Sequence, residues 1–155
     1  MRGSLARVWV AVLVLGSGCA STDPLGRIDA LRITQKQYTD MVRWGDVERA
    51  QRFVDPALRA DFVRLVAAFE GLRITDAEIG EFEHAEMTAR VTVTYRGYAV
   101  ANLVEKQAHE QQEWYRDEGL ANVWHVRPGL DAVVTALGGR LPATSPATSP
   151  ARAAP

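Results

Sequence analysis

The feature that most constrains the fold of this chain is a change of hydrophobic period at Gly71. Before that residue, apolar side chains recur at helical spacing; after it, they alternate with polar ones as in a half-buried strand. Helices followed by a run of strands are typical of α+β proteins, in which helices cover one face of an antiparallel sheet. We therefore predict one α+β domain over residues 30–138, with N-terminal helices packed on a curved antiparallel sheet of about four strands.

Capping signals divide the part before Gly71 into helices. Thr34 and Gln37 form a capping-box pair, which predicts that a first helix begins at Gln35. Gly45 then supplies a C-terminal stop, and Asp46 supplies the N-cap of a short second helix.

The third helix has the clearest pattern. Asp55-Pro56 places an N-cap before a proline at the first helical position, and Gly71 ends the helix. Its predicted apolar face consists of Leu58, Phe62, Leu65, Val66 and Phe69.

Four strands are predicted after Gly71, near residues 72–83, 87–96, 103–116 and 123–126, and a short helix over 130–137 closes the domain. The third strand is ambiguous because its centre, EKQAHEQQE, is polar on both faces. A helix over 104–113 is the alternative. We favour a strand because Trp114 and Tyr115 end the segment and a turn at Asp117-Glu118-Gly119 follows.

The N-terminus has the pattern of an export signal over residues 1–18. Arg2 and Arg7 precede an apolar run from Val8 to Leu15, which is too short to span a hydrocarbon core of about 30 Å. A cleavable signal peptide fits this pattern. The only cysteine, Cys19, follows directly after small residues.

The segment Leu15-Gly16-Ser17-Gly18-Cys19 resembles the lipobox of bacterial lipoproteins, in which the cysteine is acylated and becomes the mature N-terminus. The family pattern places leucine one position closer, where this chain has Gly16. The resemblance implies a lipidated Cys19, a linker over 19–29 and, because Ala20 is not aspartate, the outer membrane facing the periplasm. An ordinary secretory signal is the alternative.

The C-terminal residues 139–155 are expected to be a disordered tail. From Pro142 onward the sequence reads PATSPATSPARAAP, which has no large apolar side chain to bury.

The whole pattern also resembles a known fold family. The order of helices and strands, the segment LRITDAEIGEF leading into AEMTARVTVTYRGY, and the motifs Gln112-Glu113-Trp114 and Trp124-His125-Val126 look like the nuclear-transport-factor-two-like (cystatin-like cone) domain of small proteobacterial envelope lipoproteins. Members of this fold include isomerases, dehydratases and binding modules, so the resemblance implies a fold more than an activity.

Few residues offer chemistry. The three histidines, His84, His109 and His125, lack metal-ligand spacing, and after the leader serine occurs only at 21, 145 and 149, so a metal site and a serine hydrolase are not expected. In cone-fold enzymes a pocket carboxylate or tyrosine transfers the proton. The candidates in this chain are Tyr38, Asp40, Asp61, Tyr95, Glu113 and Tyr115, with both aspartates expected on solvated helix faces.

An aromatic set is predicted to fill the core or to line a pocket: Tyr38, Trp44, Tyr95, Trp114 and Trp124. The acidic residues near 76–86 are predicted to protect a sheet edge from pairing. With 18 basic and 19 acidic side chains, the formal net charge of -1 gives no attraction to nucleic acid.

The sequence therefore predicts a membrane-anchored periplasmic lipoprotein that acts as a non-catalytic binding or envelope-accessory module, with no cofactor. Its partner would be an envelope protein or a small apolar ligand. A lyase or isomerase that uses a pocket carboxylate or tyrosine is the alternative function.

Overall fold

A computed structural model describes residues 25–119 and 121–142 of the chain. The predicted signal peptide, Cys19 and most of the C-terminal tail lie outside these residues. In chain order the elements are α1 (Arg27–Arg43), α2 (Val47–Ala50), the 3-10 helices η1 (Gln51–Phe53) and η2 (Pro56–Leu58), α3 (Arg59–Glu70), β1 (Leu72–His84), β2 (Thr88–Ala99), β3 (Lys106–Arg116), β4 (Trp124–Arg127) and α4 (Leu130–Leu137).

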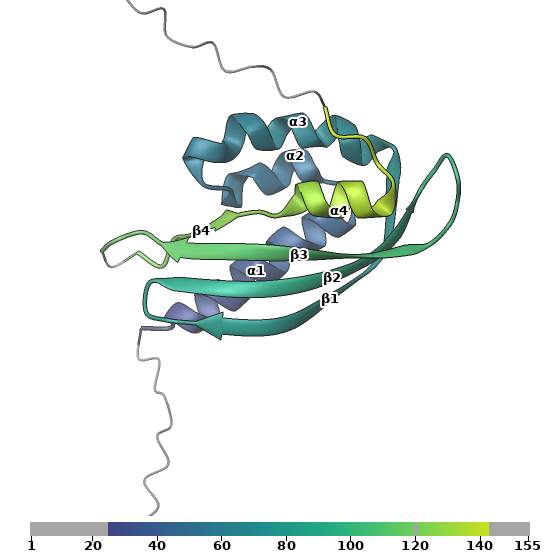
Figure 1. Ribbon diagram of the computed structural model, residues 1–155. Helices are drawn as coiled ribbons and strands as arrows, with labels where there is room; N and C mark the ends of the chain where they lie inside the picture. Colours follow the sequence, from purple (N-terminus) through teal and green to yellow (C-terminus); the bar gives the residue numbers. More distant parts are fainter. Residues whose placement is uncertain (1–24, 120, 143–155) are drawn as a thin grey trace, which may run out of the picture.

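The four strands form one antiparallel sheet in the order β1-β2-β3-β4. The sheet curves, and the helices gather on its inner face (Figure 1). Side chains along β2 and β3 alternate between buried and more exposed positions, which gives the sheet a dry inner face and a polar outer face. The predicted α+β architecture with four antiparallel strands is confirmed.

The ambiguous segment is a strand. β3 pairs with β2 from Lys106 to Tyr115, so the alternative helix over 104–113 is wrong. The segment looks polar on both faces because its inner face carries Glu110 and Gln112, both of which are fully buried. Polar side chains are tolerated there because the interior provides hydrogen-bond partners for them.

The predicted start of the first helix is wrong by eight residues. α1 begins at Arg27, so the predicted linker over 19–29 overlaps its first turn. Thr34 does not cap the helix; its hydroxyl donates to the carbonyl of Ala30 inside it. The apolar face extends back to the fully buried Leu31, and burial of this side chain supports the extra turns.

The junction between helices and sheet depends on Asp55. Its carboxylate accepts the backbone N–H of Ala57 at 3.0 Å, which confirms the predicted N-cap, and pairs with Arg127 of β4 at 3.1 Å. These contacts lower the pKa of Asp55, with the Ala57 hydrogen bond as the largest cause. The helix that follows is a 3-10 turn, η2, continued by α3.

Gly97 allows β1 and β2 to approach closely beside a bulge. A Cβ atom on Gly97 would lie 2.4 Å from the carbonyl oxygen of Arg73, which is backbone and cannot move aside cheaply. The register of β1 against β2 shifts between Ile74 and Asp76, next to this contact. The curvature of the sheet at this end therefore requires a residue without a side chain.

We expect Gly97→Ala to lower the free energy of unfolding by about 1–3 kcal/mol, the usual cost of overpacking. Gly80→Ala is the matched control because its Cβ would meet only ordinary contact at 3.4 Å from the Thr92 carbonyl oxygen. Urea unfolding of both variants measures the difference. Equal stability of the two variants would contradict this account of Gly97.

Candidate functional site

The candidate site inside the fold is a carboxylate, Glu110, buried at the centre of the inner face of β3. The hydroxyl of Tyr38 on α1 donates to its Oε1 at 3.1 Å, and the hydroxyl of Tyr95 on β2 donates to its Oε2 at 2.9 Å. The side-chain amide of Gln112 donates to Oε2 at 2.7 Å. Three elements of the fold therefore meet at one carboxylate.

The loop before α4 also approaches Glu110. The backbone N–H group of Gly129 favours the charged carboxylate and so acts to lower the pKa of Glu110. The close approach of this loop to β3 requires glycine, because a Cβ at position 129 would lie 2.9 Å from the carbonyl oxygen of Gln111. Glu110 is thus held by hydrogen bonds from α1, β2 and β3, with the loop at Gly129 packed against β3.

The hydrogen-bond network continues outward from Gln112. Its Oε1 accepts the side-chain amide of Gln35 at 3.2 Å and the indole N–H of Trp114 at 3.1 Å. Gln35 also donates to the hydroxyl of Thr39 at 2.9 Å. We call the set Gln35, Tyr38, Thr39, Tyr95, Glu110, Gln112 and Trp114 the interior polar cluster.

Burial controls the titration of this cluster. Removal from water raises the pKa of Glu110, while its hydrogen bonds act in the opposite direction. Burial, followed by the neighbouring Glu110 charge, raises the pKa of Tyr38 and Tyr95, so both hydroxyls remain protonated donors.

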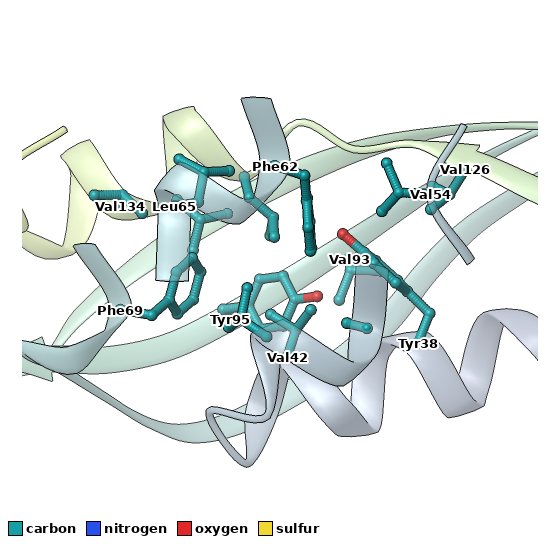
Figure 2. Close-up of a cluster of buried hydrophobic side chains, with 14 of the residues drawn as sticks. Tyr38, Val42, Val54, Phe62, Leu65, Phe69, Val93, Tyr95, Val126 and Val134 are labelled. Carbon is teal, nitrogen blue, oxygen red and sulfur yellow. The ribbon is translucent and has the colours of Figure 1, made fainter. Parts of the chain in front are cut away.

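The interior is filled around this cluster. Figure 2 shows the hydroxyl oxygens of Tyr38 and Tyr95 between α1 and the sheet, surrounded by apolar side chains such as Phe62 and Val93. The rings of Tyr38 and Trp114 pack edge to face, with centroids 5.8 Å apart. Of the buried side-chain atoms without a hydrogen-bond partner in the part of the chain that the structure describes, none belongs to the cluster.

Four of the five predicted aromatics, Tyr38, Tyr95, Trp114 and Trp124, are core residues. Trp44 is not; 77% of it is exposed. It lies outside because it follows the last residue of α1, where the chain turns away from the core. The guanidinium of Arg43 stacks on its indole ring at 5.3 Å.

Trp44 borders a cleft of about 630 Å³ between the end of α1, α2, α3 and the start of β1. We call it the Trp44 cleft. Its floor is partly apolar, with Val66, Phe69 and Leu72, and its rim carries charged residues that include Glu48 and Glu70.

A second cleft, of about 470 Å³, lies beside the β1–β2 turn and the facing ends of β3 and β4. We call it the outer-face cleft because its charged side chains lie on the outer face of the sheet. It is lined by Glu83, His84, Ala85, Thr88, Ala89, Arg90, Glu113, Trp114, Tyr115 and Arg127. Neither cleft is lined by Glu110.

The other predicted carboxylates lie outside the core. Asp40 pairs with Lys36 at 2.6 Å, Asp61 pairs with Arg64, and both remain substantially exposed, as expected from their helix faces. Glu113 and Tyr115 lie on the outer face of β3. Of the proton-transfer candidates, Tyr38 and Tyr95 are therefore the two that the structure brings together at a shared carboxylate.

Glu110, the carboxylate that joins these tyrosines, was not predicted. Two signals in the sequence could have indicated it. Alternation counted back from the buried Trp114 places Gln112 and Glu110 on the same face of the strand. The tyrosines at 38 and 95 then provide buried hydroxyls that need acceptors.

Two further kinds of feature are absent from the described part of the chain. Among these residues, no group of three or more histidine, cysteine, aspartate or glutamate side chains could hold a metal ion. Within the same residues, no helix combines the length and apolar character needed to cross a bilayer.

Comparison with known proteins gives no match: no protein family, no curated protein and no solved structure is significantly similar to this chain.

The raised pKa of Glu110 predicts a pH-dependent stability. The folded protein keeps a proton on Glu110 at pH values where the unfolded chain, with a glutamate pKa of about 4.3, has released it. The contribution of Glu110 to the free energy of unfolding should therefore fall as the pH rises above about 4, by about 1.4 kcal/mol for each unit of pKa difference.

Glu110→Gln should remove this dependence, which unfolding of the variant and the wild type between pH 4 and 9 would show. Glu113→Gln, on the exposed outer face, controls for the loss of one carboxylate. A constant stability difference between wild type and Glu110→Gln across this range would argue against a carboxyl group whose proton affinity changes on folding.

Proposed function

We propose that this protein is a lipid-anchored protein of the bacterial cell envelope, with a cone-type domain that serves as a non-catalytic binding or accessory module. The anchor is Cys19, acylated after removal of the signal peptide over residues 1–18. The domain then faces the periplasm, held to the outer membrane.

The distance between Cys19 and the folded domain supports an anchoring role. Leu25, the first described residue, follows Cys19 by six positions, which limits the linker to about 20 Å when fully extended. A lipid at Cys19 would therefore keep the domain beside the membrane.

The observation that carries the binding role is the closed interior. Three side-chain donors occupy the Glu110 carboxylate, and Glu110 lines neither cleft. A general base needs hydrogen-bond access to its substrate. Binding at the surface therefore fits the geometry better than proton transfer in the interior.

The proposed partner surface lies at the Trp44 cleft, and the proposed partner is an envelope protein with an apolar patch. α1 has 17 residues and spans about 25 Å, so Trp44 lies about that far from the end of the helix next to the anchor. A partner protein therefore fits the Trp44 cleft better than the membrane that holds Cys19.

Neighbouring residues add apolar surface at the same end. The backbone N–H of Val100 bonds to the carbonyl of Gly71, next to the cleft residue Leu72. The β2–β3 loop that follows carries Leu103, which is 70% exposed and has a left-handed φ of 54°. Backbone strain of this kind clusters at functional sites, so we include Leu103 in the proposed partner surface.

A second candidate function is favoured by one observation. Glu110 is a desolvated carboxyl group with a raised pKa beside two buried hydroxyls, a composition suited to lyase or isomerase chemistry. It requires an opening of the interior. A small apolar carbonyl compound that raises the melting temperature of the wild type but not of Glu110→Gln would favour this function.

The anchor is tested by Cys19→Ala. Cells grown with labelled fatty acid should incorporate label into the wild type but not into the variant, because the thiol is the acylation site. The variant should also move to the soluble or precursor fraction. Retention of both proteins in the membrane, with label in neither, would refute the anchor.

The partner surface is tested with a photo-crosslinking amino acid at position 44 and, as control, at Val63, an exposed residue of α3 that does not line the cleft. In intact cells, position 44 should give one discrete adduct with an envelope protein, while position 63 should not. Identical adducts at both positions, or none at position 44, would rule out this surface.

A further inference from the structure

We infer that the outer-face cleft binds a zwitterionic phosphoamine, the headgroup of phospholipids such as phosphatidylethanolamine, in the membrane beside which the protein is anchored. The inference rests on the proposed anchor for its orientation and on the cleft itself for its chemistry. The phosphate of such a headgroup is the counter-ion for the cations of the cleft, and its ammonium group is the counter-ion for the anions.

The lining of the cleft is neutral overall but strongly dipolar. Arg90 and Arg127 supply two cations, and Glu83 and Glu113 supply two anions. These residues follow one line across the sheet, since Glu83 pairs with Arg90, Arg90 with Glu113, and Glu113 with Arg127 in the strand register. Guanidinium groups bind phosphate oxygens well, and carboxylates accept hydrogen bonds from ammonium groups.

The charged side chains of the cleft are not fully paired within the protein. Among the described residues, the side chain of Glu113 has no hydrogen-bond or ion-pair partner, although it lies between two arginines in the register. Arg90 only approaches Glu83, at 3.8 Å, with both side chains largely exposed. A ligand carrying both charges would therefore gain contacts without breaking a tight ion pair.

Arg127 is held in place for a ligand. Its Nε donates to Asp55 at 3.1 Å, and its guanidinium stacks on the ring of Tyr115 at 5.1 Å. Its side chain nevertheless remains more than half exposed. A cation fixed in this way loses little side-chain entropy when it binds an anion.

The position of the cleft indicates the membrane as the source of the ligand. Arg27, at the start of α1, pairs at 2.7 Å with Glu86 in the turn that borders the cleft. Asn122, in the β3–β4 loop, donates to the carbonyl of Leu25. The chain from Cys19 therefore enters the domain at the end that carries the cleft, as the start of α1 beside the β1–β2 turn shows (Figure 1).

Apolar side chains are exposed at the same end. Leu25 and Val123 are both about half exposed, and the hydrogen bond from Asn122 brings their segments together. Exposed apolar residues beside a headgroup site are suited to contact with the interfacial region of a bilayer. The cleft volume of about 470 Å³ lies within the usual range of about 300–1,000 Å³ for small-molecule sites.

The test uses the chain from residue 20 onward, which lacks the anchor and contains every described element. Its sedimentation is measured with vesicles of phosphatidylcholine that contain phosphatidylethanolamine, and with vesicles that contain anionic phosphatidylglycerol instead. Its binding of soluble glycerophosphoethanolamine is measured separately by NMR titration. We expect binding to the phosphatidylethanolamine vesicles and to the soluble headgroup, with resonances of Arg90, Glu113 and Arg127 shifting.

Arg90→Gln and Glu113→Gln should each weaken binding by about tenfold, as expected for one hydrogen bond to a charged group. Arg96→Gln and Glu78→Gln are the matched controls, since both residues are exposed on neighbouring parts of the sheet and do not line the cleft. They should bind like the wild type. Unfolding curves confirm that all four variants fold.

Three outcomes would overturn the inference. Stronger binding to phosphatidylglycerol vesicles would indicate simple cationic attraction, and equal losses in the controls would exclude the cleft. Binding of the soluble headgroup without vesicle binding would exclude the membrane as the source. Because the chain tested carries no lipid, these results are independent of fatty-acid labelling, which alone decides whether Cys19 is the anchor.

Discussion

The fold depends on the burial of one carboxylate. Desolvation of Glu110 is costly, and the cost is offset because donors from α1, β2 and β3 converge on it. A different register of β3 or a rotation of α1 would leave this group unpaired. The interior polar cluster therefore specifies how the helix sits on the sheet, which an apolar core of similar volume would do less strictly.

This arrangement also bears on where the proposed binding site can lie. A curved sheet that wraps around helices can enclose a pocket, but in this domain the interior polar cluster and apolar side chains such as Phe62 and Val93 fill the space. Two clefts of the described residues lie toward the two ends of the sheet, one beside Trp44 and one beside Arg90 and Arg127. Each combines core side chains at its floor, Trp114 in one and Phe69 in the other, with exposed charged residues.

The sequence predicted those elements whose pattern comes from local chemistry. Asp55 capped its helix as expected, and the alternating β2 strand was confirmed in the sheet. It did not predict the start of α1, because the burial of Leu31 is a tertiary effect that overrides the local cap signal of Thr34. Glu110 was missed for a related reason: a polar residue is assigned to the surface unless its partners, distant in the chain, are known.

The two ends of the domain expose different side chains, and the difference correlates with where the chain enters the domain. The end where residue 25 enters carries paired and unpaired charges of both signs together with Leu25 and Val123, a composition compatible with a polar bilayer surface. The opposite end exposes Trp44 and Leu103. An anchored domain that contacted only its membrane would gain nothing from apolar side chains at its far end, where exposure to water is unfavourable. This distribution is what the proposed function requires: a membrane on one side of the module and a protein partner on the other.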